Sequence, residues 1–363
     1  MNRTPLYEEH KKLGAKIVPF AGWEMPLSYS GVLEEHRATR TAIGLFDVSH
    51  MGRIDLTGPA AVELLDRVAT SAVKKLAVGG MQYALVCNEQ GGILDDIMIY
   101  RFGEQRYFVC ANASNAEKIF QWLIKQAAGF SGLQVMDRSP ALAQIAVQGP
   151  RSRDLMRPIT AADLDRLKLR HCIETKVAGV PMLLSRSGYT GELGYELYLP
   201  GDRAREVWTL LTKNGAAAGL KPCGLGCRDT LRLEMGYPLY GNDMDETTTP
   251  VEASLEFAVD LGKTDFIGRE AMARQRETGI SRKLIGFELV QRGVPRHGHK
   301  IFSDGKEIGV VTSGNHSPSL NKGIGMGCVQ TTFAELGGKI QIDIRGNTVP
   351  AIIVERPFYK KKK

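Results

Sequence analysis

The sequence predicts an α+β protein that ends in a small antiparallel β-barrel. Before about residue 282, strand-like and helical segments follow one another without the regular alternation of a parallel sheet. After that point, short apolar segments such as LIGFELV, GIGMGCV and KIQIDI are separated by Gly, Asn, Asp and Pro turns, with almost no helical periodicity. This change in composition predicts a domain boundary, with a polar linker over residues 270–283 that begins as a helix.

Length and composition are those of a globular protein. The 363 residues suggest two or three domains, and 43% hydrophobic with 24% charged residues provide material for a core. No run of about 18 apolar residues is present, so we expect no membrane span. The N-terminal segment lacks the apolar stretch of a secretory signal, and we therefore expect a cytoplasmic protein.

The charge balance is modestly basic. Lys and Arg number 47 against 40 Asp and Glu, a net charge of +7, which favours an anionic substrate or an acidic partner. The dense basic cluster, Lys360 to Lys363, is terminal and typical of a solvated tail, so we do not expect a nucleic-acid site. The six cysteines contain no C-x-x-C pair, and His297 and His299 have no ligand cluster nearby. Reduced thiols and no metal are expected.

Helices are predicted where apolar residues recur at helical spacing. A helix over 33–43 stops at Gly44, one begins after Ser114 or Asn115, and others begin at about 203 and 225. Predicted strands lie at 52–57, 81–86, 94–100, 107–111, 133–136, 142–148, 181–186 and 195–199.

The segment GGILDDIMIY, residues 91–100, carries two carboxylates inside a strand. Alternation places Leu94, Asp96, Met98 and Tyr100 on one face and Ile93, Asp95, Ile97 and Ile99 on the other. A buried carboxylate is costly unless it is paired, so both aspartates could simply meet backbone amides or arginines. Asp96 is the better functional candidate, because Tyr100 on its face is an aromatic that can wall a pocket; Asp95 is interpreted as structural.

Two further segments combine charge with unusual local sequence. RSGYTGELGYE, residues 186–196, places Glu196 inside a strand after a Gly-rich turn, although an exposed hairpin would have the same composition. Arg228 lies in the first turn of a helix, where a cation opposes the helix dipole. We therefore expect its guanidinium to bind a carboxylate, from a ligand or from a partner residue. Arg232 is expected to form an internal ion pair.

Several common active-site patterns are not found. In DVSH, residues 47–50, the three polar residues are adjacent and no nucleophile elbow surrounds Ser49, which argues against a hydrolase triad. GIGMG and GLGCRD lack the context of a dinucleotide motif and the Gly-Lys-Ser/Thr ending of a P-loop, respectively. No flavin, nicotinamide or ATP site is evident.

Taken together, the segments resemble the aminomethyltransferases of the glycine cleavage system, the T-protein family. The resemblance runs nearly end to end through the following segments: TPLYEEH (4–10), PFAGWEMPL (19–27), GLFDVSHMG (44–52), GGILDDIMIY (91–100), AVQGP (146–150), SGYTGELGYE (187–196), GLGCRDTLRLEMGYPLYGNDMDE (224–246), FIGREA (266–271) and TSGNHSPSL (312–320). Each is weakly specific alone, but their order and spacing are highly specific.

The resemblance implies a cloverleaf-like fold. Two intertwined α+β subdomains, about 1–50 with 140–275 and 51–139, would form a folate-binding region over 1–275, followed by a β-barrel over 282–363. The implied reaction moves a one-carbon unit from the aminomethylated lipoyl arm of the H-protein to tetrahydrofolate. Its products are methylene-tetrahydrofolate, ammonia and dihydrolipoyl H-protein, and other glycine cleavage components would be indirect partners.

The resemblance also assigns residues. Asp96 matches the catalytic carboxylate, Glu196 the acceptor for the pterin edge, and Arg228 the contact for the anionic folate tail. Further folate contacts are expected from Met51, Tyr83, Tyr100, Asn112 and Tyr189. Where some relatives carry an aromatic, this sequence has LKLRHC (167–172), so Leu169 or His171 would form that wall.

Related proteins with this fold offer two alternatives. These are folate-dependent demethylases of small methylated substrates, and non-catalytic folate-binding proteins that assist iron–sulfur assembly. Intact Asp96, Glu196 and Arg228 argue against the non-catalytic class.

Overall fold

The computed structural model describes residues 1–361; Lys362 and Lys363 of the predicted lysine tail lie outside the described residues. The chain forms two compact units. The first contains residues 1–84 and 96–228, and the second contains residues 85–95 and the chain from Asp229 onwards. None of the helices in the described chain combines the length and apolar character needed to cross a bilayer.

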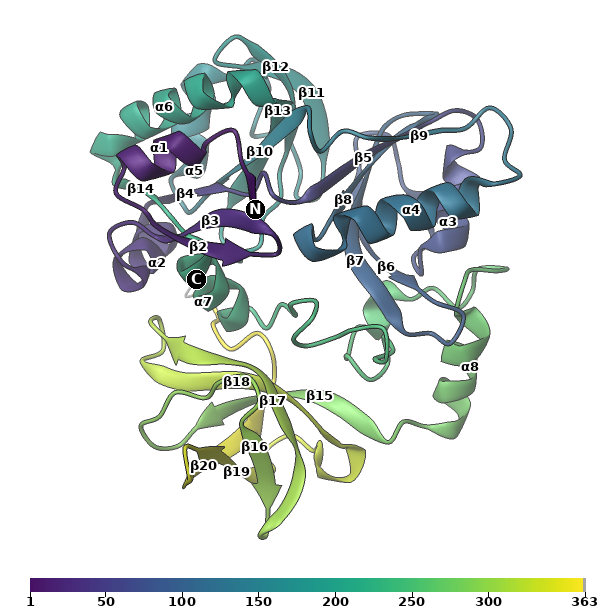
Figure 1. The fold of residues 1–363 in the computed structure, drawn as a ribbon, viewed down its shortest axis with the longest axis vertical. Coiled ribbons are helices and arrows are strands. Elements are labelled where there is room, and N and C mark those ends of the chain that lie inside the picture. Colours follow the sequence, from purple (N-terminus) through teal and green to yellow (C-terminus); the bar gives the residue numbers. More distant parts are fainter. Residues whose placement is uncertain (362–363) are drawn as a thin grey trace. The chain divides into compact units, whose positions relative to one another are not determined.

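A six-stranded sheet forms the larger part of the first unit (Figure 1). Its order is β11-β12-β13-β10-β4-β14, and only the β4–β14 pair is parallel. The strands are β4 (Ile43–Asp47), β10 (Leu142–Gln148), β11 (Cys172–Val177), β12 (Val180–Ser185), β13 (Gly194–Pro200) and β14 (Leu220–Pro222). Helices α5 (Ser152–Met156) and α6 (Ala204–Gly215) pack on it, and Trp208 and Leu211 join Tyr195 and Leu197 in its core. Helix α2 (Val32–Thr41) contacts β4 and β14.

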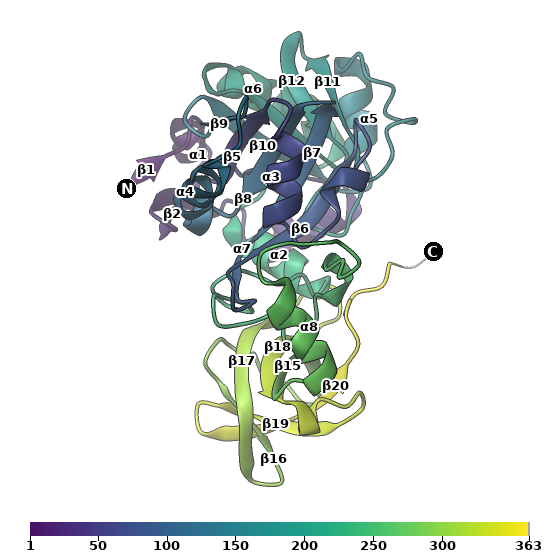
Figure 2. The ribbon, with the colours of Figure 1, turned by 90° about the vertical axis from the view of Figure 1, so that its right-hand side faces the viewer.

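A second sheet has five strands in the order β6-β7-β8-β5-β9. The strands are β5 (Gly52–Thr57), β6 (Met81–Cys87), β7 (Ile93–Gly103), β8 (Arg106–Ala111) and β9 (Gln134–Asp137). Helices α3 (Ala61–Val68) and α4 (Ala116–Ala127) pack against each other and against this sheet (Figure 2). A three-stranded sheet completes the unit with β1 (Asn2–Arg3), β2 (Lys16–Phe20), β3 (Trp23–Ser28) and the nearby α1 (Tyr7–Lys12).

The second unit contains a closed barrel of six antiparallel strands, which confirms the predicted C-terminal barrel and the α+β class. The strands are β15 (Arg282–Leu289), β16 (Lys300–Ser303), β17 (Lys306–Ser317), β18 (Lys322–Gln330), β19 (Lys339–Ile344) and β20 (Asn347–Val354). Phe287, Ile301 and Ile342 have no exposed surface and lie in the barrel core. Helix α7 (Leu225–Glu234) begins in the first unit and ends in the second, and α8 (Arg269–Thr278) precedes the barrel.

The predicted domain limits differ from the compact units. The five-stranded sheet uses strands between residues 52 and 137, and the six-stranded sheet uses strands on either side of that range. Residues 229–281, however, group with the barrel rather than with the N-terminal region. The exact domain limits therefore stay a prediction.

The role expected for Gly44 was wrong. Helix α2 ends at Thr41, and Gly44 lies inside β4 instead of terminating the helix. A Cβ atom at Gly44 would lie 2.2 Å from Thr39 Oγ1 and 3.1 Å from Cys223 Sγ. Close packing of β4 on these side chains thus explains the glycine. Strands β1 to β4, β11, β14 and β16 were not predicted, whereas β5 and β10 coincide with their predicted ranges.

Candidate active site

Asp96 lies within β7, and both of its carboxylate oxygens accept hydrogen bonds from neutral donors. Tyr83, on the neighbouring strand β6, donates its hydroxyl to Oδ2 at 3.2 Å. Asn112, immediately after β8, donates its amide to Oδ1 at 2.7 Å and to the Asp96 carbonyl at 3.1 Å. Asp96 is half-buried while Asp95 has no exposed surface. The structure therefore brings together three of the residues singled out from the sequence and separates the two aspartates by face.

Tyr100 differs from its expected place. It has no exposed surface, and its hydroxyl lies 2.6 Å from that of Tyr198 on β13. Its ring packs edge-on against Phe108 and Tyr198, because both sheets direct large side chains into the same core cluster. Tyr100 is thus a support beneath a site and not the wall of an open pocket. Met51, which is half-buried, packs against the same cluster.

Glu196 lies in β13, as predicted, and is half-buried. Its Oε2 accepts a hydrogen bond of 2.5 Å from the Ser187 hydroxyl, and its Oε1 accepts one of 3.2 Å from the Gln144 amide. The carboxylate is therefore oriented from both sides. An exposed hairpin, the alternative considered for residues 186–196, does not describe it.

The loop before β13 is built around the side chain of Gln148, which the sequence did not single out. Gln148 donates to the Ser187 carbonyl at 3.1 Å and accepts from the Thr190 hydroxyl at 2.9 Å. A Cβ atom at Gly188 or Gly194 would lie 1.9 or 2.2 Å from this amide, so both glycines are needed for the amide to enter the loop. Gly188 and Gly194, two of the three glycines in SGYTGELG, were the available signal for a buried group at this place.

A buried ion pair ties the same loop to α2. Arg40 donates to the Thr190 carbonyl at 2.7 Å and lies 3.1 Å from the Glu192 carboxylate, and both side chains are almost fully buried. Tyr189, within this loop, is half-buried, and its ring centroid lies 4.7 Å from the guanidinium carbon of Arg228. This distance is that of a cation–π contact. The structure thus brings the predicted Tyr189 and Arg228 together.

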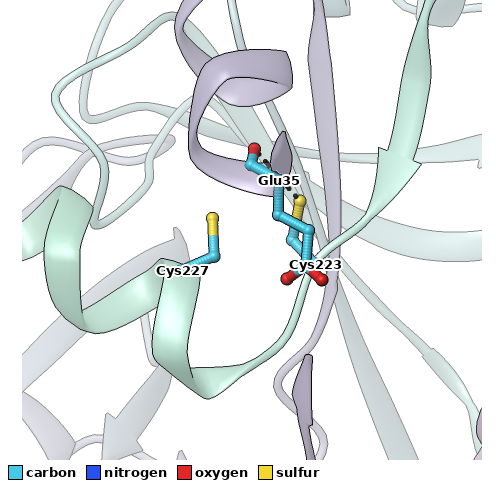
Figure 3. Close-up of side chains that lie close together, drawn as sticks. All are labelled: Glu35, Cys223 and Cys227. Atoms are coloured by element: carbon cyan, nitrogen blue, oxygen red, sulfur yellow. Dashed lines mark hydrogen bonds between the residues drawn. The ribbon is translucent and has the colours of Figure 1, made fainter. Parts of the chain in front are cut away.

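Arg228 is placed by the turn between β14 and α7. Glu35, with no exposed surface, accepts the backbone N–H of Gly224 on Oε2 at 2.9 Å. Its Oε1 accepts the N–H groups of Tyr29 and Gly31. Figure 3 shows this side chain beside Cys223, with Cys227 nearby on the first turn of α7. One buried carboxylate therefore fixes the turn whose helix carries Arg228 in its first turn.

The ligand atoms of Glu35, Cys223 and Cys227 lie within 4.8 Å of one another, a spacing compatible with a metal ion. Burial raises the pKa of the Cys227 thiol well above its ordinary value, and the thiol lies 3.9 Å from the Thr39 hydroxyl. The Cys223 thiol donates to the Lys221 carbonyl at 3.3 Å. We interpret the group as a hydrogen-bonded support of the turn. The six cysteines are thiols rather than disulfides, and five of them are buried.

The DVSH segment does not form a triad. The Asp47 carboxylate contacts His10 Nε2 at 2.8 Å and the Thr4 hydroxyl at 2.6 Å, and the Ser49 hydroxyl donates to the Gln144 carbonyl. Burial would raise the Asp47 pKa, but these hydrogen bonds, that from His10 foremost, lower it to about 2. Burial lowers the pKa of His50 to about 3, with a contribution from the charge of Arg228.

Fold and site together define a protein whose α+β unit presents two oriented carboxylates, on β7 and β13, with an arginine at the start of α7. Such a set suits a ligand with adjacent N–H donors and an anionic end. Two family models match the chain: the GCVT N-terminal domain over residues 6–263 and the glycine cleavage T-protein C-terminal barrel domain over residues 282–360. The chain belongs to the glycine cleavage T-protein family.

Full-length relatives agree with this membership. The chain is 47% identical to an aminomethyltransferase of Symbiobacterium thermophilum, over 99% of this chain and 98% of the relative. It is 44% identical to an aminomethyltransferase of Lysinibacillus sphaericus, over 100% and 99%. The crystal structure of the glycine cleavage system aminomethyltransferase T from Bartonella henselae matches with a TM-score of 0.93 and 37% identity, covering 99% of this chain and 98% of that chain.

Proposed function

We propose that this chain is the aminomethyltransferase of the glycine cleavage system. It takes the one-carbon unit from the aminomethylated lipoyl arm of the H-protein and transfers it to tetrahydrofolate. Membership of the family and full-length similarity to two bacterial aminomethyltransferases support the activity. The particular observation that carries it is the half-buried Asp96 carboxylate, oriented by Tyr83 and Asn112.

The reaction exchanges four bonds at one carbon. The carbon loses its bonds to the lipoyl sulfur and to the amino nitrogen, and it forms bonds to the two bridging nitrogens of the folate. The two protons displaced from those nitrogens are balanced by the new thiol and by the released ammonia. A base or hydrogen-bond acceptor beside the attacking nitrogen lowers the barrier by orienting its lone pair towards the carbon.

Asp96 is the residue proposed for that position. Because Tyr83 and Asn112 each donate to one of its oxygens, the carboxylate plane is fixed before substrate binds. A carboxylate oxygen has two lone pairs and can accept more than one donor, so the proposed role has it accept the N–H of a folate nitrogen. Preorganisation of this kind contributes to catalysis because no reorganisation is needed during the reaction.

The ends of the folate are assigned to other residues of the same unit. The carboxylate of Glu196 accepts paired N–H donors from the aminopyrimidinone edge of the pterin. Arg228 pairs with the anionic benzoyl-glutamate tail, with Tyr189 stacked on its guanidinium. Met51 supplies apolar contact, while Tyr100 supports the site from the core without touching the folate.

Asp96→Asn tests the proposal. It keeps the side-chain shape but removes the charge, so turnover should fall by about 100-fold or more while folate affinity changes little. The measurement is methylene-tetrahydrofolate formation from purified aminomethylated H-protein, with folate binding measured by calorimetry. Asp55→Asn is the matched control, because Asp55 lies on β5 of the same sheet and pairs with Arg138 at the surface.

The same assay distinguishes the alternatives. Wild-type protein that forms methylene-tetrahydrofolate from a free methylated amine or sulfonium compound, and not from the H-protein, would identify a demethylase instead. Normal turnover by Asp96→Asn would remove Asp96 from the mechanism. A wild-type protein that binds folate without turning over any donor would favour the non-catalytic class.

A further inference from the structure

Gln144 lies next to Glu196, although no sequence pattern singles it out. The residue is on β10, 2% exposed, and directly opposite Tyr198 of β13 in the antiparallel register. Glu196 lies two residues along β13 on the same face, so the Gln144 amide reaches it diagonally, at 3.2 Å. The Gln144 side chain is thus the buried neighbour of the carboxylate that we assign to the pterin.

The orientation of this amide is set by three partners. Its Nε2 donates to Glu196 Oε1 and to the Tyr198 hydroxyl at 3.1 Å, and its Oε1 accepts from the Cys110 thiol at 3.6 Å. A flipped amide would direct its oxygen at the carboxylate and its two N–H groups at a single thiol. The surrounding groups therefore select the orientation in which an N–H faces Glu196.

The network continues from one sheet to the other. The Tyr198 hydroxyl lies 2.6 Å from the Tyr100 hydroxyl, and Tyr100 is four residues from Asp96 on β7. Cys110, the partner of the amide oxygen, lies on β8 of the same five-stranded sheet. Gln144, Tyr198 and Tyr100 are all buried, so the hydrogen bonds between them are not exchanged with water. A buried hydrogen-bond network in which each polar group has a partner fixes the relative positions of its side chains more strictly than apolar packing does.

We propose that Gln144 is a positioning residue for folate: it holds Glu196 at the angle at which both carboxylate oxygens meet the donor edge of the reduced pterin. The inference depends on the proposed role of Glu196. Ser187 holds the second oxygen from the loop, whereas Gln144 holds the first from the core. The chain through Tyr198 and Tyr100 further ties that carboxylate to the strand that carries Asp96. Gln144 itself contacts no substrate.

The test is a double-mutant cycle with Gln144→Met and Glu196→Gln. Methionine has a similar length and no N–H, so Glu196 loses its inner hydrogen bond while the core stays filled. We expect Gln144→Met to raise the KM for tetrahydrofolate about 10-fold, with kcat changed by less than about two-fold, because the reacting end at Asp96 is untouched. In the Glu196→Gln background the same change should have little further effect, since the carboxylate through which Gln144 acts is gone.

A second variant keeps the test informative if Gln144→Met does not fold. Gln144→Asn keeps an amide in the buried position but withdraws it by one methylene, so it should also raise the KM for folate and leave kcat nearly unchanged. Tyr107→Phe is the control for a buried polar change in the first unit, because the Tyr107 hydroxyl has no hydrogen-bond partner in the described residues and the ring lies on β8. Its kinetic constants should equal those of the wild type.

The outcomes separate this inference from the proposed function. If Glu196→Gln raises the folate KM and neither Gln144 variant does, Gln144 has no positioning role while the proposed function stands. If the KM increase in the double variant equals the product of the increases in Gln144→Met and Glu196→Gln, the inference is also overturned, because Gln144 then acts independently of Glu196. An unchanged folate KM in Glu196→Gln would overturn the role of both residues at the pterin.

Discussion

At the scale of single residues, His50 connects the site to the pH dependence of stability. It is 3% exposed, and its Nδ1 has no hydrogen-bond partner in the described chain. Its folded pKa of about 3 lies below the value of about 6.5 expected in the unfolded chain. The folded state therefore binds fewer protons, so this contribution to stability is complete above about pH 6.5 and is lost as pH falls towards 3.

His50→Asn should remove that dependence. Between pH 6.5 and 4.5, the wild type should lose about 2 kcal/mol of unfolding free energy that the variant does not lose. Asp47, with a pKa of about 2 against about 3.9 unfolded, acts in the same direction but only below about pH 4. Urea unfolding of both proteins across this range gives the difference directly. If the unfolding free energies of the two proteins change equally with pH, protonation of His50 does not destabilise the folded state.

Asp96 shows how far residue-level prediction reaches. Strand alternation separated Asp96 from Asp95 correctly, because side-chain direction in a strand depends only on parity. The same alternation could not tell that Tyr100, on the face of Asp96, is covered by Tyr198 from another sheet. Gln144, on β10, was missed for a similar reason: its side-chain partners come from β8 and β13, and no local pattern marks them.

At the scale of elements, the turn between β14 and α7 depends on Glu35. Three backbone N–H groups point at its carboxylate. Glu35→Gln places an amide where only acceptors fit, leaving at least one buried donor unsatisfied, and should destabilise the protein by about 1–3 kcal/mol. Because the turn carries Arg228, the KM for folate should also rise. Thermal unfolding and steady-state kinetics measure the two effects.

The control for this change is Glu34→Gln on the same helix. Glu34 pairs with Lys221 at 2.8 Å, but both side chains are about half exposed, and such surface pairs contribute about 0–1 kcal/mol. Its stability and kinetics should stay close to wild type. Equal effects of the two substitutions would mean that negative charge on α2 matters rather than the hydrogen bonds of Glu35.

Elements themselves were predictable where their signal was local. The barrel strands other than β16, together with β5, β10 and the start of α7, follow from periodicity and turn residues. Helix α2 was predicted too long, since Gly44 signals a helix end in sequence but serves close packing of β4 against Thr39 and Cys223. Strand β11 was missed because its register is set by pairing with β12 and not by its own composition.

At the scale of the whole molecule, α7 is the continuous element between the two compact units. Its first turn, with Arg228, belongs to the first unit, and the chain from Asp229 belongs to the second. Within the second unit, Arg232 pairs with Asp229 at 2.8 Å and with Asp243 at 3.0 Å, which confirms the predicted internal ion pair. Asp243 also accepts hydrogen bonds from Thr312 and Ser313 of β17, so α7 and the barrel share one buried polar network.

Asp243→Ala should therefore destabilise the second unit strongly. The Asp243 side chain has no exposed surface and that of Arg232 only 3%, so removal of the carboxylate takes its buried anionic partner from a buried guanidinium. The partially exposed Asp229, the Tyr237 carbonyl and the Ser313 hydroxyl are neighbours that it keeps. Loss of one member of a buried pair costs about 3–5 kcal/mol. Glu288→Ala is the control, because the Glu288–Lys322 pair lies on the barrel surface and should contribute under about 1 kcal/mol. Urea unfolding of the full chain compares the two. Because α7 runs from Arg228 into this network, Asp243→Ala should also raise the KM for folate at temperatures where the variant is still folded. A loss of stability with an unchanged KM would show that the first turn of α7 is held by Glu35 alone.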